Sequence, residues 1–176
     1  MGTYEFILKF RLPDPHADPE QHLEALADAG CEDATAGIGQ PGRLALDFAR
    51  QAGSALDAVV SAVRAVQAAI PGVALVEASP DLVGLTDVAA LFGCSRQNVR
   101  KLMTSHPATF PPAVHEGAAS LWHLRQVLAW FRDTQRRPVD GALVEVAEVT
   151  MKLNIANATQ RLGREGVPKA ILSLFA

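Results

Sequence analysis

Long hydrophobic runs are missing from this chain of 176 residues. No apolar stretch approaches the roughly 20 residues needed to span a bilayer. The N-terminus also lacks the basic region, apolar block and cleavage site of a secretory signal. Both absences argue against a membrane protein and against a secreted one. We therefore expect a cytoplasmic protein that does not engage a membrane.

Cysteine is equally scarce, because Cys31 and Cys94 are the two examples in the chain. They lie far apart in sequence and neither belongs to a Cys-x-x-Cys pair, so neither a disulfide framework nor a zinc site is indicated. We interpret His115 and His123 as ordinary exposed or hydrogen-bonded histidines rather than metal ligands. The sequence therefore predicts no metal and no cofactor.

Signatures of catalysis are also absent. The chain has no P-loop, no GxGxxG after a strand, no HExxH, no GxSxG and no acid pair set among His or Cys at metal-ligand spacing. Gly37, Gly39 and Gly42 are better explained as turn residues, because no helix N-terminus follows them directly to hold a phosphate. We predict that the protein is not an enzyme.

What the chain does have is an uneven distribution of charge around a formal net charge of −3. Residues 1–83 hold 5 Lys and Arg against 12 Asp and Glu, residues 84–137 hold 7 against 3, and residues 138–176 hold 4 of each. Positive charge is therefore concentrated in the middle segment. Such a segment suits contact with nucleic-acid phosphates, while the acidic remainder weakens non-specific attraction to them.

The first eighty residues alternate strand-like and helix-like patterns, with Asp18 and Ser54 as the helix caps. In order, we predict a strand over 3–12, a helix over 19–29, a hairpin of strands over 31–39 and 42–50, a helix over 54–70 and a strand over 73–78. This order resembles the ferredoxin-like βαββαβ arrangement, which the ACT-type regulatory modules share. The turn after the first strand lacks the glycine of amino-acid-binding ACT modules, so the resemblance implies a pairing or sensing domain over 1–79 without a particular ligand.

A second unit is predicted over 82–137, after the linker Ser79-Pro80-Asp81. It opens with two helix starts about nine residues apart, at Thr86 and Ser95, and Gly93 ends the first helix. Two short helices joined by a tight turn have the geometry that places the second helix in a DNA major groove.

The second of these helices has two faces of different character. Val99, Leu102 and Met103 recur at helical spacing and are expected to face inward. The opposite side is cationic and amide-rich, which suits base edges and phosphates. The residues predicted to contact DNA here are Ser95, Arg96, Gln97, Arg100, Lys101 and Thr104. The alternative is a solvated charged face on an ordinary helix.

A wing and a closing helix are predicted next. Residues 110–114 and 120–122 would pair across a turn at Glu116-Gly117, with His115 near the tip. The closing helix then buries an apolar face together with Trp122 and Trp130. The arginines expected to reach phosphates are Arg125, Arg132, Arg136 and Arg137.

In the segments LTDVAALFGCSRQNVRKL, FPPAV and LWHLRQVLAWF, over 82–135, the chain resembles the winged helix-turn-helix of the MerR and phage excisionase (AlpA-like) superfamily. The resemblance implies DNA contacts from Arg96, Gln97, Arg100 and Lys101, and contact of the wing from His115 to Gly117 with the backbone or minor groove. MerR regulators begin with this domain and excisionases are little more than it, whereas here another domain comes first. Neither an inducer nor a recombination role is therefore implied.

Residues 138–176 are predicted as a long helix over 139–162 followed by a short apolar tail. The helix has a near-heptad apolar stripe that needs a partner, so we expect it to dimerise the protein. The tail would leave Ile171, Leu172, Leu174 and Phe175 in water unless it docked on the core or across a dimer interface.

The sequence as a whole predicts an α+β protein with a ferredoxin-like domain, a winged helix-turn-helix domain and a C-terminal dimerisation helix. We expect a bacterial transcriptional regulator that binds double-stranded DNA as a homodimer. The alternative is a protein-interaction adaptor, antitoxin-like or a phage accessory factor, whose helix-turn-helix does not bind DNA. No residue pattern supports a small-molecule effector.

Overall fold

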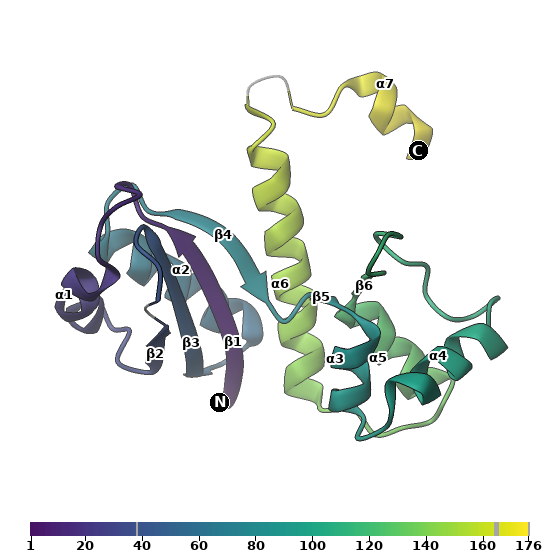
Figure 1. Cartoon of the computed structure of the whole chain (residues 1–176). Helices are drawn as coiled ribbons and strands as arrows, with labels where there is room; N and C mark the ends of the chain where they lie inside the picture. The colour runs from purple at the N-terminus through teal and green to yellow at the C-terminus, as the bar shows by residue number, and fades with distance from the viewer. Residues whose placement is uncertain (38, 164–165, 176) are drawn as a thin grey trace.

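Two hydrophobic cores stand side by side in the computed structural model, which describes residues 1–37, 39–163 and 166–175 (Figure 1). The first core lies against a sheet in the N-terminal half, and the second lies among short helices in the C-terminal half. Helix α6 (Gly141–Gln160) runs between them and contributes to both. The α+β class is as predicted. Among the described residues, no helix combines the length and apolarity that crossing a bilayer demands.

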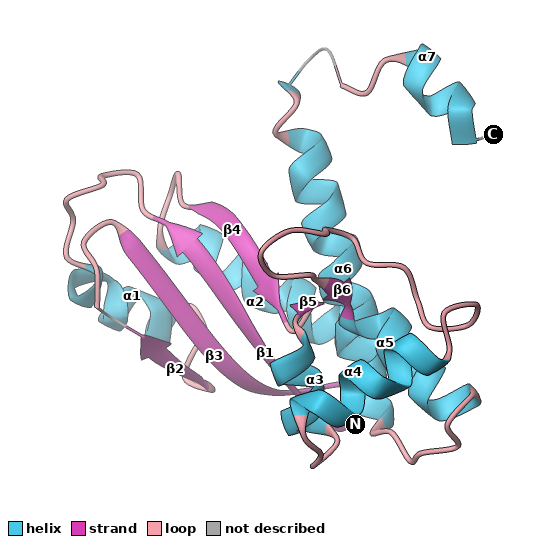
Figure 2. Cartoon of the chain, turned by 45° about the vertical axis from the view of Figure 1, so that its right-hand side comes forward, coloured by secondary structure: helices cyan, strands magenta, loops and turns pink. Residues whose placement is uncertain are grey.

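The N-terminal sheet has the strand order β2-β3-β1-β4, and every neighbouring pair is antiparallel. Its strands are β1 (Gly2–Arg11), β2 (Ala34–Gly37), β3 (Arg43–Ala52) and β4 (Ala74–Ser79). A 3-10 turn (Pro19–His22) leads into α1 (Leu23–Asp28), and α1 and α2 (Ala55–Ala69) lie on one face of the sheet (Figure 2). The predicted caps are confirmed, since Asp18 accepts from the Glu20 N–H and Ser54 from the Asp57 N–H.

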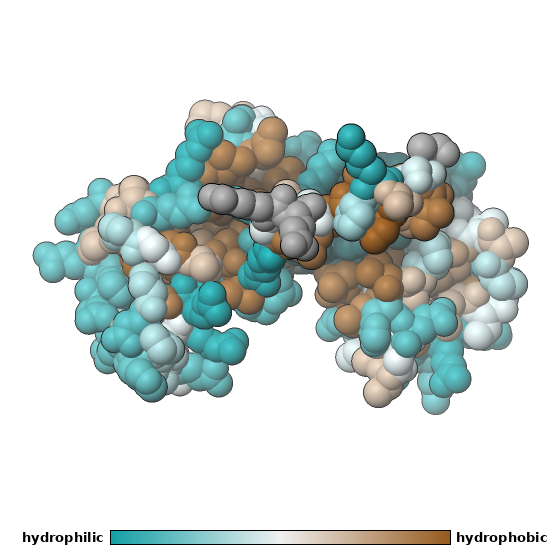
Figure 3. Space-filling model, turned by 90° about the horizontal axis from the view of Figure 1, so that it is seen from above, coloured by the Kyte–Doolittle hydropathy of each residue, from teal (hydrophilic) through white to brown (hydrophobic). Residues whose placement is uncertain are grey.

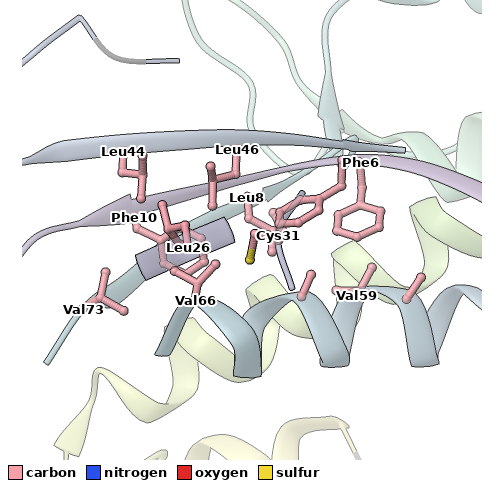
Figure 4. Packing of buried hydrophobic residues seen from close by; sticks show 14 of the residues in the cluster. Phe6, Leu8, Phe10, Leu26, Cys31, Leu44, Leu46, Val59, Val66 and Val73 are labelled. Carbon is pink, nitrogen blue, oxygen red and sulfur yellow. The ribbon is translucent and has the colours of Figure 1, made fainter. Parts of the chain in front are cut away.

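Alternation along the strands builds the first core, because every second side chain points at α2. The large inward residues of β1 and β3 are Phe6, Leu8, Phe10, Leu44, Leu46 and Phe48. Val59 and Val66 meet them from α2 (Figure 4). Since each such side chain contributes roughly 1.5–3 kcal/mol when buried, this layer dominates the stability of the N-terminal half.

One charged residue lies inside this half. Arg50 on β3 donates to both carboxylate oxygens of Asp33, at 2.7 and 2.8 Å, and to the carbonyl oxygen of Gly30 at 2.6 Å. The hydrogen bonds from Arg50 hold the pKa of Asp33 below its ordinary value. The pair ties the loop between α1 and β2 to the sheet, a contact that no local sequence pattern predicts.

The C-terminal half begins with β5 (Leu82–Val83), which pairs with β6 (Trp122–His123). Its helices are α3 (Leu85–Leu91), α4 (Arg96–Ser105) and α5 (Leu124–Asp133). Trp122 and Trp130 are buried as predicted, and the ring of Phe110 meets that of Trp130 edge-on at 4.9 Å. Helices this short are marginal alone, so the aromatic core holds them in place.

Helix α6 uses its apolar stripe within its own chain. One row packs on the first core and consists of Ala142, Val146, Val149 and Leu153. A neighbouring row packs on the second core and consists of Leu143, Val144 and Ala147. The expectation that this stripe needs a second copy is therefore wrong, because two cores of one chain already meet on it. A dimer would have to use another surface.

Polar side chains of α6 hold the predicted linker in place. The amide of Asn154 accepts from the Ala78 N–H and donates to the Ala78 carbonyl and to the Asp81 carboxylate, each at 2.8 Å. Thr150 donates to the carbonyl of Pro80 at 2.6 Å. The segment between the halves is thus fixed along its length, and we call these contacts of Asn154, Thr150 and Asp81 the junction.

Asp81 connects the junction to the C-terminal half. Its carboxylate is 3% exposed and lies 2.6 Å from Nδ1 of His123, while its carbonyl accepts from the Leu124 N–H at 2.7 Å. A buried carboxylate needs such partners because an unsatisfied one is costly. Through Asp81, therefore, α6 also positions the start of α5.

The C-terminal tail lies outside both cores. Helix α7 (Lys169–Leu172) and the 3-10 turn Ser173–Phe175 bury no residue, and Phe175 is 85% exposed. Hydrophobic side chains face outward on the side where Figure 1 places α7 (Figure 3). The predicted docking of this tail on the chain's own core is wrong, which leaves the other predicted partner, a dimer interface.

Replacing Asn154 with Ala removes three hydrogen bonds from the junction. At roughly 1 kcal/mol for each bond, we expect the free energy of unfolding to fall by about 2–3 kcal/mol, measured by urea denaturation. The control Thr159→Ala removes only a bond to the Ile155 carbonyl within α6 and should change it by less than about 0.5 kcal/mol. Equal effects of the two changes would contradict the role given to Asn154.

Asp33→Asn tests the Arg50 ion pair through pH. Because the pKa of Asp33 is depressed in the folded state, its contribution to stability is complete above the ordinary aspartate value and is lost as the pH falls through the depressed one. We expect the variant to be about 2 kcal/mol less stable at neutral pH, with the difference shrinking below about pH 4. Denaturation curves at several pH values measure this.

Asp28→Asn, a change at an exposed carboxylate of α1, provides the control and should follow the wild-type curve. A stability difference for Asp33→Asn that stayed constant at every pH would show that the charge of Asp33 contributes nothing.

Candidate nucleic-acid interface

Helix α4 is held by one deep anchor and a cap. Val99 is fully buried in the second core, and Leu102 and Met103 pack against that core from the side. The Ser95 hydroxyl accepts from the Asn98 N–H at 3.1 Å, which confirms the predicted cap. Gly93 has a φ of +59°, a left-handed conformation that favours glycine and lets the chain turn sharply out of α3.

The start of α3 differs from the prediction. The N-cap is Gly84 rather than Thr86, and the carboxylate of Asp87 accepts from the Gly84 N–H at 2.8 Å. Helix α3 therefore begins earlier than expected, because Asp87 reaches back to satisfy the first amide. The turn between α3 and α4 is unaffected.

The outer face of α4 is open to solvent. Arg96, Gln97, Arg100 and Lys101 are all exposed, and none of these three cations forms an ion pair within the described residues. In Figure 1, α4 lies at the side of the molecule away from the acidic sheet domain. The structure thus brings these four predicted residues together on one accessible surface, which we call the α4 face.

Two predicted contacts at the ends of α4 behave differently. Ser95 is exposed but uses its hydroxyl for the cap, and Thr104 turns its hydroxyl back to the carbonyls of Arg100 and Lys101, at 3.0 and 3.1 Å. Asn98 is exposed on the flank of α4 and was not among the predicted contacts.

The wing is shorter than predicted. The expected partner strands reduce to a single bridge between His115 and Leu121, with Val114 donating to the Leu121 carbonyl at 2.8 Å. Trp122, which was assigned to the wing, pairs instead with Val83 of β5. His115 therefore sits at the base of the loop rather than near its tip, and the tip residues 116–119 carry one acid and no cation.

Most of the arginines of α5 and the segment after it are occupied within the chain. Arg125 pairs with Glu148 of α6 at 3.2 Å, and Arg132 pairs with the adjacent Asp133 at 2.8 Å. Arg137 donates to the Phe92 carbonyl at 3.4 Å. Hydrogen bonds from Lys152 and Arg125 hold the pKa of Glu148 below its ordinary value. Arg125 thus fastens α5 to α6 and lies outside the α4 face.

Among the described residues, no cluster of three or more His, Cys, Asp or Glu side chains could hold a metal ion. Cys31 is buried, which raises the pKa of its thiol, and Cys94 is partly buried. Comparison of the chain with family models, with curated proteins and with solved structures found no match.

Proposed function

We propose that the protein is a sequence-specific DNA-binding regulator of transcription in which α4 enters the major groove. The observation that carries the proposal is the α4 face, a set of exposed cations and amides on a helix that Val99 and the Ser95 cap hold in place. We also infer a ferredoxin-like fold for residues 1–79 and a MerR/AlpA-like winged helix-turn-helix for 82–137, on strand order and on the α3–α4 turn.

The residue types fit direct readout of bases. Arg100 can donate two hydrogen bonds to O6 and N7 of guanine, and Gln97 can pair with N6 and N7 of adenine. Lys101 reaches either guanine or phosphate. Arg96 and the first amides of α4 favour a phosphate, because a helix N-terminus attracts an anion. Base contacts thereby supply specificity and phosphate contacts supply register.

The size of the reading head favours two copies. Helix α4 has 10 residues and is therefore about 15 Å long, so one copy contacts only a few base pairs. The short wing adds no cation to extend the contact. We therefore propose a homodimer that reads two half-sites, with the exposed tail at Lys169–Phe175 as the surface left to join the copies.

The same tail supports a second candidate, a protein-interaction adaptor. Leu172, Leu174 and Phe175 are more than half exposed, and a protein partner would cover them. Salt separates the two functions, because a DNA reader loses affinity steeply as salt rises. An adaptor would not bind added DNA in this salt-dependent way.

Arg100→Ala tests the readout. After selection of bound sequences from a random duplex pool, we expect this variant to lose about 1–3 kcal/mol of affinity for the selected site without a change in its melting temperature. Arg96→Ala should instead reduce the slope of log affinity against log salt concentration by about one unit, because one phosphate contact is lost. The control is Arg64→Ala, a change at an exposed arginine of α2, which should bind like the wild type.

Undiminished affinity of Arg100→Ala for the selected site would remove α4 from the groove. Failure of the wild type to enrich any sequence, with retained binding of a protein partner, would favour the adaptor.

The dimer is tested by light scattering on the full chain and by the form of the enriched motif. We expect a mass of two chains at micromolar concentration and a palindrome whose half-sites lie about one DNA turn, roughly 34 Å, or a multiple apart. A single chain that enriches a single asymmetric site would contradict the dimer and leave the readout by α4 standing.

A further inference from the structure

A hollow of about 740 Å³ lies beside the outer edge of β4, between the end of α2 and the last turns of α6. Its apolar part includes Val63 of α2, Leu75 of β4 and Leu153 of α6, and Arg11, Arg43 and Arg161 are its charged residues. Viewed from the end of the molecule where α6 stops, hydrophobic surface alternates with hydrophilic groups (Figure 3). The volume falls in the range of small-molecule sites.

The charge of this hollow is opposite to that of its surroundings. Residues 1–83 carry more than twice as many acids as bases, 12 against 5, yet the lining includes three arginines and no carboxylate. An acidic domain has ample carboxylates with which to neutralise surface arginines. Their exclusion from the lining leaves a local positive field that selects for an anion.

Arg11 and Arg43 lie directly opposite each other in the β1–β3 register, and both are exposed. Like charges in this arrangement are destabilising. Lys9, two residues away on the same face, is neutralised by Glu77 at 2.9 Å, whereas Arg11 and Arg43 form no ion pair within the described residues. A bound anion would relieve their repulsion, since a carboxylate or phosphate accepts hydrogen bonds from two guanidinium groups.

The third arginine is fixed at the wall of the hollow. Nη2 of Arg161 donates to the Leu75 carbonyl at 2.9 Å, and the Asn157 amide donates to the same oxygen at 3.0 Å. Both side chains thereby cover the outer edge of β4, where strand carbonyls would otherwise be unpaired. The guanidinium of Arg161 is consequently held at the edge of β4, although the residue is exposed to solvent.

We propose that this hollow binds an organic anion, a carboxylate or phosphate monoester with an apolar body. The anionic group would lie between Arg11 and Arg43 on the outward face of the sheet, and the apolar body would lie over Ala74, which pairs with Arg11 in the β1–β4 register, and over Val76 at the outer edge of β4. This anion site does not require that the protein bind DNA. Arg161, next to the end of α6, also lines the hollow, so an occupant would lie beside the helix that supplies Thr150 and Asn154 to the junction.

The test is calorimetric titration of the full chain with phenyl phosphate as the probe. We expect saturable binding to the wild type that is stronger than that of inorganic phosphate, and no binding of the neutral analogue phenol. Arg43→Gln and Arg11→Gln should each weaken the phenyl phosphate affinity about tenfold or more. Arg64→Gln on α2 removes the same charge outside the hollow and should bind as the wild type does.

Thermal unfolding without ligand checks the variants. Because the substitution removes like-charge repulsion, Arg43→Gln should melt at or above the wild-type temperature, so a loss of binding cannot come from unfolding. Wild-type affinity in Arg43→Gln, or an equal loss in Arg64→Gln, would overturn the site. So would phenyl phosphate binding to the wild type weaker than about 1 mM. Equal affinity for inorganic phosphate would overturn the assignment of an apolar body.

Discussion

The burial of Asp81 between α6 and His123 is the constraint on which the arrangement of the halves depends. One oxygen of its carboxylate accepts a hydrogen bond from Asn154, and the other lies beside Nδ1 of His123. Its backbone carbonyl accepts from the N–H of Leu124, the first residue of α5. Because a buried carboxylate is tolerated only with such partners, the linker has one stable position. The sheet, α6 and the helices that carry α4 are therefore joined by a few polar contacts as well as by the apolar rows of α6 that pack on the two cores.

The exposure of the α4 face follows from this arrangement. Helix α6 occupies the space between the halves, so the acidic sheet domain does not reach the cations of α4 (Figure 1). Arg125 and Arg137 are used to hold α5 and the chain after it, which leaves Arg96, Arg100 and Lys101 as the accessible cations of the α4 face. The cations of this half therefore have two roles: some stabilise the fold through contacts within the chain, and those of α4 remain exposed to solvent.

Local signals predicted most of the secondary structure, whereas contacts between distant residues were beyond the sequence. Caps at Asp18, Ser54 and Ser95 act over two or three residues, and the strands of the sheet follow from alternation. The stripe of α6 gave the right helix and the wrong partner, since periodicity shows that a face is buried but not what covers it. The ion pair of Arg125 with Glu148 was beyond the sequence for the same reason, because the two residues lie 23 positions apart.

Nuclear magnetic resonance mapping of the full chain, titrated with a duplex enriched from a random pool, locates the DNA-contacting surface residue by residue. If α4 enters the major groove, backbone amide shifts change most over 95–105, with smaller changes at the loop after His115 and none across the open face of the sheet. Changes confined to the sheet domain or to the tail at 169–175, with α4 unaltered, would contradict this mode of binding.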